Sequence, residues 1–109
     1  MSSDATFKVV ASGSQWSLGG TNDSWKVFSV ERELIVDSIM DNGINGVVLV
    51  SGDIHMSQVR QIRAPSAGSY ELWELISSPL ANTNSKGGCP TSAQPDKLVF
   101  CHNSTRYFG

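Results

Sequence analysis

Apolar and polar residues alternate or cluster along the chain in a way that predicts four strands before the last quarter of the sequence. Residues 7–12 carry β-favouring side chains and then meet Gly13, which is typical of a short strand entering a loop. Residues 46–51 hold a run of branched aliphatic side chains, which indicates a strand covered on both faces. Residues 58–63 and 70–76 are expected to form two more strands joined by a turn.

A helix is predicted between the first two strands, over residues 30–42. Ser29 is expected to cap its N-terminus, and Asn42-Gly43 is expected to end it in a left-handed turn. Four apolar residues recur at helical spacing and are predicted to face the core: Val30, Leu34, Ile35 and Ile39. Four polar residues are expected on the solvated side: Arg32, Asp37, Ser38 and Asp41.

The remainder of the chain has fewer regular signals. Residues 77–96 are rich in Pro, Gly, Asn and Ser and predict a loop, whereas residues 97–101 could form a last short strand.

The 109 residues are enough for one domain and too few for two. A helix that leads into a buried strand indicates the α/β class, with a mixed sheet and one main helix. Because the chain ends on an unpartnered aromatic pair, we expect it to be part of a larger fold.

Charge and composition narrow the classes of partner. Eight Lys and Arg against ten Asp and Glu give a formal charge of −2, without a run of either sign, which argues against a nucleic-acid partner. The longest apolar run is far below the roughly 20 residues that cross a bilayer. Residues 1–5 lack the features of an export signal, so if the protein is exported, its signal is expected outside this chain. Cys89 and Cys101 fit either a disulfide outside the cytosol or two thiols inside it, and two glycosylation triplets tip the choice slightly towards a secreted protein.

The residues with the clearest chemical potential follow the buried strand directly, in Gly52-Asp53-Ile54-His55. Ligands of α/β sheets bind beyond the carboxyl ends of the strands. Gly52 is expected to let the backbone turn, and an extended alternation would point Asp53 and His55 to one side while Ile54 returns to the core. A carboxylate and an imidazole placed in this way form half of a metal site. The alternative, which spacing alone favours, is that Asp53 caps the next turn and His55 is a hydrogen-bonded histidine at a strand end.

Three blocks of sequence together resemble the C-terminal part of the catalytic domain of PhoD-like (alkaline phosphatase D-like) metallophosphatases. The first is Asp23-Ser24-Trp25 with the helix start at residues 31–34, and the second is the strand that ends in Gly-Asp-x-His. The third, about twenty residues later, is the segment 70–80, which ends in Ser-Ser-Pro-Leu. The resemblance covers residues 6–81 and leaves residues 82–109 as a loop-rich tail.

This resemblance implies a fold and an activity. The fold would be a calcineurin-like αββα metallophosphatase sandwich, of which residues 1–109 form a single partial domain. The activity would be hydrolysis of phosphate mono- or diesters at a metal centre that usually includes iron and in some members calcium. In the family pattern His55 resembles a metal ligand and Asp53 the neighbouring acidic site residue, so both are candidate catalytic residues.

The resemblance also implies that the site is incomplete. The upstream motifs that supply the other Asp, Asn and His ligands are absent from these 109 residues. Ligand number and geometry set metal affinity, so the chain alone is expected to be inactive and to need the missing N-terminal part of the same domain. The alternative function is a non-catalytic accessory or interaction domain derived from the same fold.

Other candidate residues have weaker support. Arg60 and Arg63 could steer an anionic phosphate ester, with Arg60 as the candidate substrate-binding residue, although two isolated arginines more often lie at a solvated edge. His102 beside Cys101 could be a pair of metal ligands, but a disulfide or a plain loop is the simpler interpretation. Two more residues lie where the family often has residues near the pocket, although packing or strand-end hydrogen bonding explains them equally well: Gln15 and Trp25.

Overall fold

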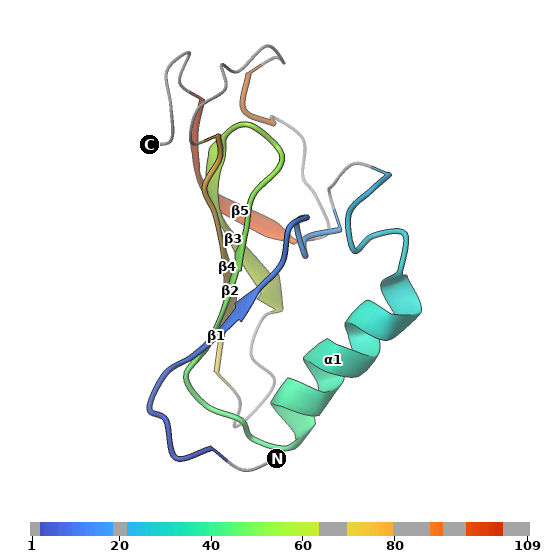
Figure 1. The fold of residues 1–109 in the computed structure, drawn as a ribbon, viewed down its shortest axis with the longest axis vertical. Helices are drawn as coiled ribbons and strands as arrows, with labels where there is room; N and C mark the ends of the chain where they lie inside the picture. The colour runs from blue at the N-terminus through green and yellow to red at the C-terminus, as the bar shows by residue number, and fades with distance from the viewer. Residues whose placement is uncertain (1–2, 19–21, 64–69, 80–87, 91–95, 104–109) are drawn as a thin grey trace.

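The computed structural model describes residues 3–18, 22–63, 70–79, 88–90 and 96–103, which form a five-stranded mixed sheet with one helix packed against it (Figure 1). The strands lie in the order β1-β2-β4-β3-β5; β1, β2 and β4 are parallel, and β3 and β5 each run antiparallel to a neighbour. The elements are β1 (Lys8–Ala11), α1 (Ser29–Asp41), β2 (Val47–Ser51), β3 (Ser57–Arg63), β4 (Leu72–Ile76) and β5 (Lys97–His102). The predicted α/β class, with a mixed sheet and one main helix, is confirmed.

Helix α1 ends as its sequence predicts but begins differently. It starts at Ser29 itself, with Phe28 in the N-cap position and no side-chain cap, so the prediction that Ser29 caps the helix is wrong. At the other end Gly43 has a φ of +60°, and its N–H donates to the carbonyl of Met40. The N–H of Ile44 donates to the carbonyl of Ile39, which completes a Schellman motif. Only a residue that tolerates the left-handed region ends a helix in this way at little cost.

The buried face of α1 differs from the predicted one. Ile39 is buried as predicted, but Val30 and Leu34 are 70% and 66% exposed. Arg32, expected in solvent, is 1% exposed, because its guanidinium finds partners beneath the helix. Hydrophobic periodicity takes no account of hydrogen-bond partners from distant parts of the chain. The face of α1 that it predicts to be buried therefore differs from the face that is buried in the structure.

The core lies between α1 and the sheet. It consists of apolar side chains from the helix, the strands and the loop after β1, namely Trp16, Val36, Ile39, Val47, Leu49, Ile62 and Leu72. Gly46 sets the entry to β2, because its φ is +73° and a Cβ there would lie 2.0 Å from the carbonyl oxygen of Thr6. The first strand can therefore approach β2 closely only with glycine at this position.

The other face of the sheet has no covering layer among the residues described (Figure 1). The strand register places Val50, Leu75, Val59 and Phe100 in one row across four strands. Leu75 and Phe100 in this row are 44% and 52% exposed. The expectation that β2 is covered on both faces is therefore wrong for this part of the fold.

The structure bears on two questions that the sequence raises, the pairing of the two cysteines and the presence of a membrane-spanning helix. Cys89 and Cys101 form a disulfide that ties β5 to the segment before it, so the paired alternative holds. In the described part of the chain, no helix has the length and apolar character that crossing a membrane requires.

Candidate metal-binding edge of the sheet

The carboxyl ends of the three parallel strands meet at one edge of the sheet. The loops that follow β1, β2 and β4 therefore gather there. Strand β3 begins at this edge with Ser57, and β5 ends there with His102, its partner in the register. The edge thus holds the loop with Asp53 and His55, as the sequence predicts.

The backbone leaves the strand geometry immediately after β2. Asp53 has a φ of +73° and His55 a φ of +56°, and the N–H of Ile54 donates to the carbonyl of Gly52 at 3.0 Å, which is a γ-turn. The predicted extended alternation is therefore wrong, because a left-handed turn and not the pleat of a strand orients the two side chains. Gly52 is not the residue that turns, and a Cβ on it would make ordinary contact with the carbonyl of Ser77 at 3.6 Å.

The backbone of His55 is hydrogen-bonded to the loop that follows β4. Its backbone N–H donates to Ser78 Oγ at 3.1 Å, and the neighbouring Ser77 N–H donates to the carbonyl of Ser51 at 3.1 Å. The Gly-Asp-x-His block and the Ser-Ser-Pro block, separate in the sequence, are thus in direct contact. The imidazole Nδ1 is buried and has no hydrogen-bond partner among the described residues.

Asp53 presents its carboxylate to solvent at the turn. Within the described ranges, it makes no salt bridge with His55, and no group of three or more His, Cys, Asp or Glu side chains is placed to hold a metal ion. The structure therefore places the two predicted ligands in one short turn, and their role as metal ligands stays a prediction.

Arg60 is not at a solvated edge. Its side chain is 1% exposed, Nε donates to Gln58 Oε1 at 2.7 Å, and a terminal nitrogen donates to the carbonyl of Asp96 at 3.3 Å. Burial lowers the pKa of Arg60, while Glu74 and Asp96 act in the opposite direction. A role of Arg60 in binding the ester stays a prediction and would require the guanidinium to become accessible. The side chain of Arg63 lies outside the described residues.

Glu74 is the residue of this edge that the sequence did not single out. It is 0% exposed, and its carboxylate accepts the backbone N–H groups of Trp16 at 2.6 Å and Ser17 at 3.0 Å and the hydroxyl of Ser51 at 2.5 Å. The carboxylate thus holds the loop after β1 against the end of β2. A single glutamate within an apolar strand was the available signal, since a buried carboxylate requires partners.

The two residues matched to the family pocket lie near this edge. Gln15 is buried, and its amide donates to Ser17 Oγ at 3.0 Å. Trp25 stacks on Trp16, with ring centroids 4.4 Å apart and planes within 5°. His102, exposed at the end of β5, follows a disulfide-bonded Cys101, so these two residues are not a pair of metal ligands.

The fold and this edge define an α/β protein with a candidate metal site beyond the carboxyl ends of its parallel strands. The family model of the PhoD-like phosphatases matches residues 1–108, and the chain belongs to this family. A solved structure described as "Structure of PhoD" is similar, with a TM-score of 0.52 and 25% identity. The match covers 69% of this chain and 17% of that one, so the chain spans a small part of the length of PhoD. A search of curated proteins gave no match.

Proposed function

We propose that this chain is part of a metal-dependent phosphoester hydrolase in which His55 and Asp53 hold a metal ion. The observation that carries the proposal is the buried imidazole Nδ1 of His55, which has no hydrogen-bond partner among the described residues. A buried nitrogen without a partner is costly, and a bound metal ion would satisfy it. The family supports the same chemistry, since PhoD-like phosphatases act on phosphate esters.

The donor atoms favour one class of metal over another. An imidazole nitrogen with a carboxylate oxygen suits iron and similar transition metals, whereas calcium prefers oxygen ligands alone. We therefore propose that His55 binds iron. Calcium, in a protein that uses it, would bind through the carboxylate of Asp53. When bound, such an ion would polarise the phosphoryl group and acidify a water molecule. The contribution of the chain is to hold the imidazole in place, through the hydrogen bond from the His55 N–H to Ser78.

We also propose that the remaining ligands come from other parts of a PhoD-like catalytic domain. The match to 17% of the PhoD chain supports this view. Two donors alone give weak metal binding, so the 109 residues alone should show little hydrolysis. The natural ester, and the choice between mono- and diester, depend on those other parts.

We propose an extracytoplasmic location for the protein. The support is the disulfide between Cys89 and Cys101, because such bonds persist in oxidising compartments and are rare in the cytosol. Alkylation of the protein in intact cells, followed by mass measurement, tests this. Both cysteines should resist alkylation until a reductant is added, and labelling without reductant would overturn the proposal.

Hydrolysis of nitrophenyl phosphate and bis(nitrophenyl) phosphate tests the function. Both substrates are offered to this chain and to the longest protein whose reading frame contains it, each loaded with iron or calcium. Metal-dependent hydrolysis by the longer protein should be lost in His55→Ala and Asp53→Asn and retained in the matched controls His102→Ala and Asp41→Asn. Absence of hydrolysis in both proteins would favour the non-catalytic accessory domain instead.

A further inference from the structure

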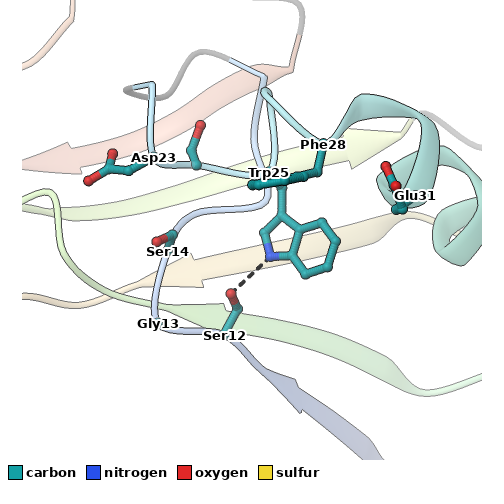
Figure 2. Close-up of a pocket in the computed structure, with 8 residues that line it drawn as sticks. Ser12, Gly13, Ser14, Asp23, Trp25, Phe28 and Glu31 are labelled. Carbon is teal, nitrogen blue, oxygen red and sulfur yellow. Dashed lines mark hydrogen bonds between the residues drawn. The ribbon is translucent and has the colours of Figure 1, made fainter.

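A concave site lies at the end of β1, apart from the turn that holds Asp53 and His55. It is an open cavity of about 480 Å³ between the loop that follows this strand and the segment that leads into α1 (Figure 2). The N–H of Ser12, one of the lining residues, donates to the carbonyl of Val50, so the cavity adjoins the end of β2. Neither Asp53 nor His55 lines it. The proposed hydrolytic function therefore does not account for this site.

The wall of the cavity is aromatic. The indole of Trp25 is fixed on one face by the stacked ring of Trp16, which is itself 2% exposed. Its Nε1–H already donates to Ser12 Oγ at 2.9 Å (Figure 2). The indole therefore offers a ligand its ring surface and not a hydrogen-bond donor. Phe28, 57% exposed, adds a second ring to the lining.

The charge of the lining has one sign. Asp23 and Glu31 lie on opposite sides of the indole in Figure 2, and no Lys, Arg or His is among the lining residues that the structure describes. The other polar residues of the lining are serines. A carboxylate such as that of Glu31 repels a phosphate or another carboxylate and attracts a cation, and a tryptophan face adds an attraction for cations that carry apolar substituents.

We propose that this cavity binds an organic ammonium group, with the Trp25 ring as its platform and the exposed carboxylate of Glu31 as the source of negative charge. The walls place apolar surface and carboxylates around one space of small-molecule size. An alkylated ammonium ion requires both, because its substituents need apolar contact and its charge needs compensation. A bare metal ion would make no use of the aromatic wall. The proposal is independent of the hydrolytic function.

Choline and dimethylbutanol, its uncharged isostere, are the probes. Each is titrated into the 109-residue chain, and the indole N–H signals of Trp25 and Trp73 are followed by NMR. Trp73, which pairs with Val48 in the sheet and is not a lining residue, is the internal reference. Choline should shift the Trp25 signal in a saturable way and bind at least about fivefold more tightly than dimethylbutanol.

Two variants separate a binding role from a structural one. Glu31→Gln, at an exposed position, should weaken choline binding by about three- to tenfold. Asp41→Asn removes the same charge at the far end of the same helix and should leave the affinity unchanged. Equal binding of choline and its isostere, an unshifted Trp25 signal, or equal affinities of the two variants would each overturn the proposal.

Discussion

The carboxylate of Glu74 accepts the backbone N–H of Trp16 at 2.6 Å, although 58 positions separate these residues in the chain. Replacing Glu74 with Gln leaves the shape intact but removes the charge and puts an N–H₂ group among backbone donors. At least one buried donor then lacks an acceptor, and Arg60 loses a nearby countercharge. We expect Glu74→Gln to lower the free energy of unfolding by about 2–4 kcal/mol, measured by urea denaturation.

Glu71→Gln is the matched control for that substitution. Glu71 is exposed just before the same strand, so the change should stay within about 0.5 kcal/mol. Equal effects of the two substitutions would mean that the buried carboxylate does not hold the loop after β1.

A second prediction concerns the face of α1 that packs against the sheet. Val36 is 0% exposed and packs in the core, whereas Leu34 is 66% exposed. Val36→Ala should cost about 1–3 kcal/mol of unfolding free energy, and Leu34→Ala, although it removes a larger side chain, should cost under about 0.5 kcal/mol. Urea denaturation of both variants measures the difference. A larger loss of unfolding free energy in Leu34→Ala than in Val36→Ala would contradict this packing and support the buried face that periodicity predicts.

A third prediction concerns Asp96 and pH. Burial raises the pKa of Asp96 above its ordinary value of 3.8, and this effect outweighs the hydrogen bond from Leu18 and the nearby charge of Arg32. The folded state then binds a proton more tightly than the unfolded state. The resulting stabilisation is fully present below pH 3.8 and is lost as pH rises through the folded pKa.

Asp96→Asn isolates this contribution. We expect the difference in unfolding free energy, wild type minus variant, to fall as pH rises from 3.8 towards neutrality. Denaturation at a series of pH values measures it. A difference that grows over the same range would show that ion pairing with Arg32, at 3.1 Å, dominates instead.

A fourth prediction concerns the face of the sheet opposite α1, which no described residue covers. Leu75 and Phe100 occupy one apolar row on that face and are exposed, and contiguous apolar surface binds the dye anilinonaphthalene sulfonate. The fluorescence of this dye with the chain should fall in Leu75→Ser and Phe100→Ser. In Leu34→Ser, which removes an exposed residue from α1, the decrease should be smaller. Equal decreases would show that this row is not a continuous dye-binding surface.

The elements of this fold were predictable because their signals are local. The aliphatic run of β2 and the Asn42-Gly43 stop of α1 act within a few residues, and the structure has both. The face of α1 was not predictable from periodicity, because Arg32 is buried through hydrogen bonds to Trp16 and Asp96. The second of these partners lies 64 positions away.

The candidate site was predictable in place but not in conformation. The position of Asp53 and His55 after a buried strand puts them at the carboxyl edge of the sheet. Their left-handed backbone was not predictable, since non-glycine residues rarely adopt it without support from the surrounding fold. For His55 that support includes the hydrogen bond to Ser78, from another strand end.

The most direct test of the metal-binding role is NMR of the two histidines during a titration with Mn²⁺. This paramagnetic ion broadens the signals of nearby nuclei and accepts imidazole and carboxylate ligands. We expect the imidazole signals of His55 to broaden at lower Mn²⁺ concentrations than those of the exposed His102, and Asp53→Asn to reduce that preference. Equal broadening of both histidines, or broadening of His102 first, would contradict a metal-binding role for His55.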